Sequence, residues 1–298
     1  MLRGVAMPPG GKPTVRSRRL GAALKRHREA AGIDQASAAE AILKSVSKVS
    51  RLEGGLTSAS ALEVRTLLDR YSVDDPKERA RLEGWAKTGN QRGWWLDFQE
   101  TVTPDYADHI TLENDATHIR SWQTALIPGL LQTPEYAESV ISAGPCFLTP
   151  ERIKGLMQVR QERQKRIEEG GVQFAAVIWE PAITSLASHP ALAVPQWQRL
   201  LDASQRHNVT VQMLPISASR AAGAAGPFVS FSFGDEPIVE AVAVENLPNT
   251  SVIEAPDDLA LYVNAFDGLR SSALSPEETA DRILQLLKGT PCSTEERP

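Results

Sequence analysis

Residues 41–55, AILKSVSKVSRLEGG, combine short hydroxyl side chains with long cationic ones in a helical pattern. Short side chains at the start of a helix allow its backbone to approach base edges, and cationic side chains further along can reach phosphates or a guanine. Gln35, at the start of the preceding helix, could direct its amide and the free N–H groups of that helix at a phosphate. The candidate DNA contacts are therefore Gln35, Ser45, Val46, Ser47, Lys48 and Arg51.

A plainer interpretation of the same residues stays open. On charge alone, Lys48 and Arg51 fit a solvated helix face as well as a DNA contact. Val46 and Ser47 could be spacers, and Ser45 could merely cap its helix. The apolar residues around these positions favour DNA contact, because they supply the skeleton of a helix-turn-helix.

That skeleton follows from apolar residues at three- and four-residue steps. Ala39 is small where two helices must cross, and Ile42, Val49 and Leu52 are apolar where the interior must be filled. The predicted helices cover residues 17–31, 35–42, 45–53 and 60–71, with a fifth over 75–87 that begins at Pro76.

The pattern resembles the Cro/C1-type (xenobiotic-response, XRE) helix-turn-helix over residues 19–73. The resemblance rests on Gln35, Ala39, Ser45 and the run VSRLEG over residues 49–54. Leu43 departs from it, since glycine is usual at this turn, and a left-handed leucine costs on the order of 1 kcal/mol. A rearranged turn is the resulting expectation. Glu53 is interpreted as a structural residue that pairs with a nearby arginine, in preference to a catalytic one.

Charge is distributed unevenly along the 298 residues. Residues 1–73 carry 13 Lys and Arg against 6 Asp and Glu, a balance of +7, whereas the whole chain has a net charge of -5. Concentrated positive charge suits a module that neutralises phosphates, fused to an acidic body of another kind. A solvated basic face is the alternative.

Composition excludes several classes of protein. With 42% hydrophobic and 23% charged residues, the chain is neither disordered nor fibrous by composition. No apolar run reaches the roughly 20 residues of a membrane span, and the first residues lack the apolar core of a secretory signal. Cys146 and Cys292 suggest neither a disulfide framework nor a metal site. We expect a cytoplasmic, nucleoid-associated protein with no cofactor and no membrane partner.

The body predicts an α+β domain with a mixed or antiparallel sheet, placed after an all-α helix-turn-helix domain of four to five helices. Strands are expected near residues 117–127, 172–180, 208–215, 228–234 and 238–246, and helices near 134–142, 149–169, 194–207, 256–269 and 276–287. The predicted organisation is a flexible basic arm (1–16), the DNA-binding domain (17–73), a helix and linker (74–94), the α+β domain (95–288) and a disordered tail (289–298).

The body also resembles actinobacterial regulators of the WhiJ type, in which such a DNA-binding head precedes a domain of unknown function. The segments that carry this resemblance are IPGLLQTPEYA (127–137), RQERQKRI (160–167), NVTVQMLP (208–215), GPFVSFSF (226–233) and AFDGLRSSALSPEET (265–279). The resemblance implies a transcriptional regulator, often paired with a small protein encoded nearby in an antitoxin-like arrangement. It assigns no ligand.

Two functions follow as expectations. The first is a sequence-specific regulator that binds double-stranded DNA as a homodimer, with a body that senses a ligand or a protein partner. The alternative is an antitoxin-like interaction protein whose body holds a small cognate protein. An enzyme is not expected, because no G-x-S-x-G, H-E-x-x-H or phosphate loop occurs. Leu130 and Leu131 could be exposed for a partner or simply buried.

Overall fold

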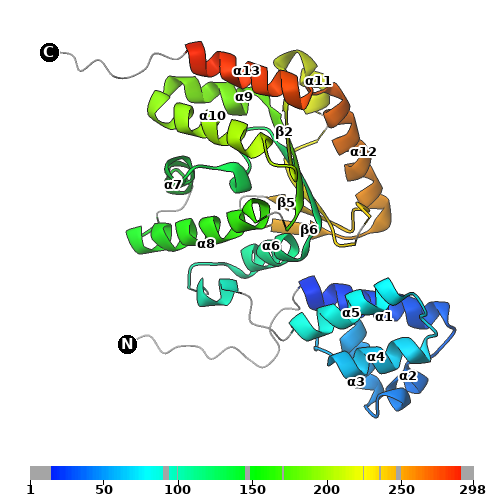
Figure 1. Cartoon of the computed structure of the whole chain (residues 1–298). Coiled ribbons are helices and arrows are strands. Elements are labelled where there is room, and N and C mark those ends of the chain that lie inside the picture. Colours follow the sequence, from blue (N-terminus) through cyan, green and yellow to red (C-terminus); the bar gives the residue numbers. More distant parts are fainter. Residues whose placement is uncertain are drawn as a thin grey trace. The chain divides into compact units, whose positions relative to one another are not determined.

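The computed structural model describes residues 15–89, 94–98, 100–144, 148–169, 171–223, 225–234, 236–245 and 250–289. The predicted arm before residue 15, the linker residues 90–93, both cysteines and the tail from 290 lie outside these described residues. The chain divides into two compact units, Met1–Leu96 and Asp97–Pro298 (Figure 1).

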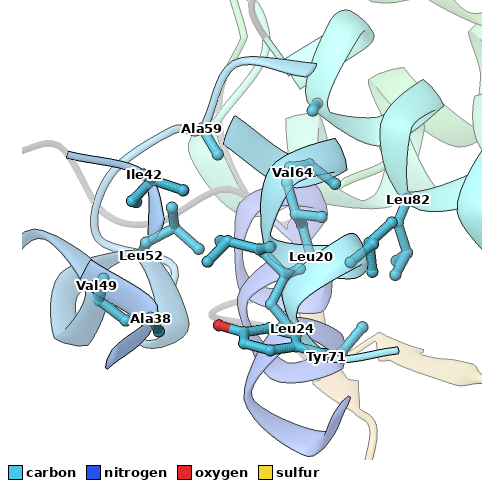
Figure 2. Close-up of a cluster of buried hydrophobic side chains, with 14 of the residues drawn as sticks. Leu20, Leu24, Ala38, Ile42, Val49, Leu52, Ala59, Val64, Tyr71 and Leu82 are labelled. Carbon is cyan, nitrogen blue, oxygen red and sulfur yellow. The ribbon is translucent and has the colours of Figure 1, made fainter. Parts of the chain in front are cut away.

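The first unit is a bundle of helices around one apolar core (Figure 2). Its helices are α1 (Val15–Ala30), α2 (Gln35–Ala41), α3 (Val46–Glu53), α4 (Ala61–Arg70) and α5 (Pro76–Gly89). Leu24, Val49 and Leu68 are fully buried where the helices meet. Leu82 of α5 is buried in the same cluster, so α5 packs as part of this bundle. The expectation of an all-α first domain with four to five helices is confirmed.

The second unit is built on a six-stranded mixed sheet of order β3-β2-β1-β4-β5-β6. The strands are β1 (His118–Gln123), β2 (Gln173–Trp179), β3 (Val209–Leu214), β4 (Phe228–Ser232), β5 (Ala241–Glu245) and β6 (Thr250–Ile253). Strands β1, β2 and β3 run parallel, whereas β4, β5 and β6 pair antiparallel. The α+β fold is therefore confirmed, with the mixed form of the sheet.

Helices cover both faces of this sheet (Figure 1). Trp122 of β1 packs with Phe266 and Leu269 of α12 on one face. Ile119 and Ser121 of the same strand line a cavity together with residues of α6 and α8, so they point to the other face. The longer helices are α6 (Pro104–Asp115), α7 (Pro134–Ser142), α8 (Pro150–Glu168), α10 (Pro190–Ser204), α12 (Pro256–Ser272) and α13 (Pro276–Gly289).

Several elements were not predicted. They are α6, β6, the short helices α9 (Glu180–Thr184) and α11 (Ser219–Ala222), and the 3-10 turns η1 (Trp94–Phe98), η2 (Gly129–Leu131), η3 (Ser185–Ser188) and η4 (Ile216–Ala218). Helix α6 begins with the same Thr-Pro signal as α7 and α8, since Thr103 accepts a hydrogen bond from Tyr106 N. Among the described helices, none has the length and apolar character needed to cross a bilayer.

Candidate functional site

The turn between α2 and α3 keeps the left-handed conformation in spite of its leucine. Leu43 has φ 53° and its side chain is 89% exposed. The turn is closed by Leu43 N, which donates to Glu40 O at 3.0 Å, and Lys44 N, which donates to Ala39 O at 2.9 Å. The expected rearrangement is therefore wrong: the strain is retained because the surrounding hydrogen bonds and the buried Ile42 fix the backbone.

Helix α3 presents one buried face and one exposed face. Ser45 caps the helix by accepting a hydrogen bond from Lys48 N at 3.2 Å. Val49 and Leu52 are buried in the bundle core. The exposed residues of this segment are Lys44, Ser45, Val46, Ser47, Ser50 and Arg51. Lys44 was missed as a candidate, although it directly precedes the capping serine.

Arg51 and Lys48 differ in their surroundings. Arg51 is exposed, and its guanidinium has no hydrogen bond or ion pair with another residue that the structure describes. Lys48 is half-buried, and its Nζ donates to Thr57 Oγ1 at 3.0 Å and to Ser58 O at 2.7 Å. In this structure Lys48 thus holds the loop after α3, while Arg51 is available to a ligand.

Gln35 points into the bundle. Its Nε2 donates to Glu53 Oε2 at 2.8 Å, and Glu53 also accepts from Nε of Arg28 at 2.6 Å. The start of α2 is capped by Asp34, whose carboxylate accepts from Ser37 N at 2.8 Å. A phosphate at this helix start would meet a negative charge. The interpretation of Glu53 as a structural residue paired with an arginine is confirmed.

Tyr71 completes this buried cluster. It is 4% exposed, and its hydroxyl has no hydrogen-bond partner among the described residues. Burial, together with the nearby charge of Glu53, raises the pKa of Tyr71 to about 12. The tyrosine therefore stays neutral beside the Arg28–Glu53 pair at any physiological pH.

The exposed face of α3 can contact a duplex in two ways. Ser47 and Val46 are short and lie in the first turn, where a helix approaches base edges in the major groove. Arg51, in the last turn, can reach a guanine with two hydrogen bonds or bind a phosphate. The arrangement therefore suits recognition of a duplex.

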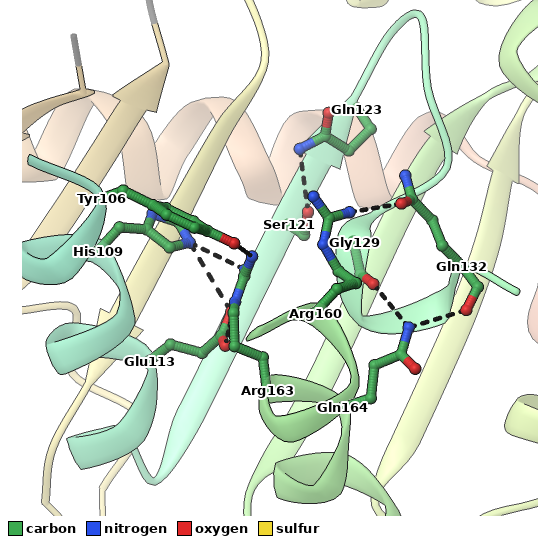
Figure 3. Close-up of polar contacts among 10 residues, drawn as sticks. All are labelled: Tyr106, His109, Glu113, Ser121, Gln123, Gly129, Gln132, Arg160, Arg163 and Gln164. Atoms are coloured by element: carbon green, nitrogen blue, oxygen red, sulfur yellow. Dashed lines mark hydrogen bonds and ion pairs between the residues drawn. The ribbon is translucent and has the colours of Figure 1, made fainter. Parts of the chain in front are cut away.

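The second unit holds a buried polar cluster that could suggest acid–base chemistry (Figure 3). Arg163 donates to Glu113 Oε1 at 2.8 Å and Oε2 at 2.7 Å, to Tyr106 Oη at 2.8 Å, and lies 3.3 Å from His109 Nε2. The Arg163 guanidinium lowers the pKa of Glu113 to about 2 despite the opposing effect of burial. A carboxylate held ionised in this way is a poor proton carrier at neutral pH. We therefore interpret the cluster as structural: its hydrogen bonds connect α6 to α8.

Other candidate acid–base residues of the body have structural contacts. Glu180 accepts from Ile216 N at 2.9 Å and from Arg282 at 3.1 Å. His118 Nδ1 lies 3.1 Å from Thr117 Oγ1. Within the part of the chain that the structure describes, no three His, Cys, Asp or Glu side chains gather closely enough to hold a metal ion.

The PGLLQT segment, residues 128–133, is buried, and glutamine side chains form hydrogen bonds with its backbone. Leu130 is 3% and Leu131 0% exposed, so these leucines pack inside the unit and are not available to a partner. Gln196 accepts from Thr133 N at 2.9 Å and donates to Leu131 O at 2.8 Å. The sequence did not identify this role of Gln196, which lies 65 residues away from Leu131.

Comparison with known families agrees with this division of the chain. Residues 19–82 match a family described as a helix-turn-helix domain, which indicates DNA binding. Residues 106–285, more than half of the chain, match the domain of unknown function DUF5753. No curated protein sequence and no solved structure matches the chain. By these matches the chain belongs to the DUF5753 family and carries a helix-turn-helix domain ahead of the family's domain.

Proposed function

We propose that the protein is a sequence-specific transcriptional regulator of the Cro/C1 type, in the WhiJ-like group, with α3 in the major groove. The observation that carries the proposal is the exposed face of α3, where Ser47 and Arg51 lie opposite a fully buried Val49. The Arg51 guanidinium has no ion pair within the described part of the chain. The proposed DNA-binding segment covers residues 17–73, and the proposed regulatory domain covers 95–288. The regulator acts on chromosomal DNA in the cytoplasm.

The proposed contacts differ in what binding requires of them. Arg51 can bind without breaking a contact, and Val46 and Ser47 can approach base edges directly. Lys48 must exchange its bonds with Thr57 and Ser58 for a phosphate or a base. Ser45 and Gln35 act mainly by fixing α3 and α2. Ser45 contacts the DNA backbone at the start of α3, whereas Gln35 must exchange its bond with Glu53 for a phosphate to do so at the start of α2.

A homodimer is part of the proposal. One recognition helix reads only a few base pairs, so useful affinity requires two half-sites. We expect half-sites about 34–36 Å apart, one turn of the duplex, or a multiple of that spacing.

The test selects duplexes that the full-length protein binds from a random library, and then measures the effect of Arg51→Ala. We expect a loss of about 1–3 kcal/mol on the selected operator and relaxed specificity at one base pair. Arg70→Ala is the matched control, since Arg70 is also an exposed arginine, at the end of α4. We expect no base-specific change from it. Unchanged operator binding by Arg51→Ala, or no duplex binding at low salt, would refute the proposal.

A surface of the second unit favours the alternative, an antitoxin-like protein that binds a small cognate protein. A hollow of about 470 Å³ is lined by Asp258 and by mostly apolar residues that include Val244, Ile253 and Tyr262. Leu261, at its rim, is 67% exposed. If this function is the main one, native cells yield the protein with a stoichiometric small partner, and Leu261→Glu releases it. Purification without such a partner favours the regulator that senses a small ligand.

A further inference from the structure

A cavity of about 160 Å³ lies in the second unit between β1, α8 and the loop before α7 (Figure 3). It is separate from α3 and from the apolar hollow beside α12. Ser121 and Gln123 of β1 border it on one side, and Arg160 of α8 on the other.

Hydrogen bonds hold the wall of the cavity in place. Gln164 Nε2 donates to Gly129 O at 3.0 Å and to Gln132 O at 2.8 Å, and Gln132 Nε2 donates to Ile127 O at 2.8 Å. Leu130 and Leu131, on the same loop, are buried. The loop is therefore fixed at both its carbonyl groups and its side chains, which is typical of a preformed ligand site.

Arg160 brings positive charge into this cavity. One of its terminal nitrogens donates to Gln132 Oε1, and its Nε is buried with no hydrogen-bond partner among the described residues. No carboxylate of the described residues forms an ion pair with it. The other arginine of the lining, Arg163, is already neutralised by Glu113. Glu245 lies at the exposed rim, where solvent screens its charge.

The remaining lining is of two kinds. Ser121 is buried, and its hydroxyl is 3.5 Å from Gln123 Nε2, a long contact that leaves both groups able to bind a ligand. His109 Nδ1 is also buried, and no residue that the structure describes forms a hydrogen bond with it. Val140, Phe174 and Val229 supply apolar surface. A ligand here meets one cation, a few polar groups and a hydrocarbon wall.

We infer that this cavity binds a small monocarboxylate with an apolar body. A guanidinium donates two parallel hydrogen bonds to a carboxylate, and only one terminal nitrogen of Arg160 has a hydrogen-bond partner among the described residues. A dry cavity of about 150 Å³ accommodates benzene, so the body has about six carbon atoms. A phosphate dianion fits less well, because one arginine leaves half of its charge buried and uncompensated. The inference specifies the ligand-sensing part of the proposed function, and its test uses no DNA, so that either can fail alone.

The test is calorimetric titration of the full-length protein with benzoate and isovalerate, and with their neutral amides benzamide and isovaleramide. We expect saturable binding of at least one carboxylate, with a Kd of about 1 mM or tighter. The matching amide should bind at least about tenfold more weakly, because it cannot accept the same pair of charge-assisted bonds. Inorganic phosphate is the competing anion and should bind more weakly than the carboxylate.

Two variants locate the site. Arg160→Gln should raise the Kd of the carboxylate at least about tenfold. Arg152→Gln, on the exposed side of the same helix, should leave it unchanged. If Arg160→Gln does not fold, Leu126→Trp serves in its place, since Leu126 is 42% exposed at the lining and a larger ring there closes the cavity.

The results that overturn the inference are equally definite. They are no saturable binding of either carboxylate, equal binding of acid and amide, stronger binding of phosphate, or full carboxylate binding by a folded Arg160→Gln or Leu126→Trp protein. An equal loss in Arg152→Gln also overturns it, because the effect would then depend on the general charge of α8.

Discussion

Arg28 of α1 donates two hydrogen bonds to Glu53 at the end of α3, from Nε to Oε1 at 2.6 Å and from a terminal nitrogen to Oε2 at 3.0 Å. Both side chains are buried. Gln35 of α2 donates to the same carboxylate, so one charged group joins three helices. The orientation of α3 therefore depends on an ion pair that lies on the side opposite its exposed residues.

Glu53→Gln should destabilise the first unit strongly. The substitution keeps the shape of the side chain but removes the buried counter-charge of Arg28 and leaves only the exposed Glu29 near it. Breaking a buried pair costs about 3–5 kcal/mol. Urea unfolding of the full chain, monitored by circular dichroism, measures the loss. Glu29→Gln is the control, because Glu29 is 3.7 Å from the same guanidinium but 56% exposed at its side chain. We expect that control to change stability by less than about 1 kcal/mol.

Equal unfolding midpoints for Glu53→Gln and the wild type would contradict the role of this ion pair. A loss of stability in Glu29→Gln as large as that in Glu53→Gln would contradict it as well, because exposure would then not distinguish the two contacts.

Leu43→Gly should stabilise the protein. Its φ of 53° is strained for leucine, and its side chain is 89% exposed, so little packing is lost with it. Relief of the strain, less the larger entropy of an unfolded glycine, leaves a gain of about 0.5–1 kcal/mol. Leu43→Ala is the control: it removes most of the side chain but retains Cβ and hence the strain. If Leu43→Ala stabilises the protein as much as Leu43→Gly does, then the exposed leucine side chain, and not the strained φ, lowers the stability of the wild type.

Much of the fold could be predicted from local signals. Ser45, Ser60, Thr133 and Thr149 each cap a helix that the sequence predicted to begin at that place. Helix α6 begins with the same signal at Thr103-Pro104, but the aromatic residues just before it obscured the helical pattern, and α6 was not predicted. Strand β6 was missed for another reason. It is four residues long with no clear alternation, and its pairing with β5 defines it.

Less of the candidate sites than of the fold could be predicted from the sequence. The exposed face of α3 follows from helical periodicity, which places Ser47 and Arg51 together. The contacts of Lys48 with Thr57 and of Gln35 with Glu53 depend on tertiary packing, which no local pattern encodes. Arg163 and Glu113 are 50 residues apart, and Arg160 meets the PGLLQT loop only because α8 packs beside it. The cavity is lined by residues from several separate elements, and no local periodicity in the sequence relates these residues to one another.

Acid should weaken the second unit through Glu113. Its pKa is about 2 in the folded protein, against 4.5 for an unperturbed glutamate, because Arg163 favours the ionised form. The ion pair thus stabilises the fold fully above about pH 4.5, and this contribution is lost as the pH falls towards 2. Urea midpoints measured from pH 7 to pH 2 for the wild type and Glu113→Gln test this. We expect the variant to be less stable at pH 7 and to lose less on acidification.

Glu138→Gln is the control for this acid effect, since Glu138 is exposed on α7. It should follow the wild-type profile. Parallel profiles for Glu113→Gln and the wild type would mean that other carboxylates govern the acid transition.

Gly21→Ala should disrupt the packing of α3 against α1. A Cβ at residue 21 would lie 2.3 Å from Leu52 O and 2.7 Å from Glu53 O, and these backbone atoms cannot move without shifting the end of α3. We expect a loss of about 1–3 kcal/mol in urea unfolding and weaker binding to a selected operator. Gly84→Ala is the matched control, because it also lies within a helix but a Cβ there would meet nothing within 4 Å. It should gain about 0.5–1 kcal/mol and leave DNA binding unchanged. Wild-type stability in Gly21→Ala would mean that α1 and α3 can separate without cost, and α3 would then not be held as described.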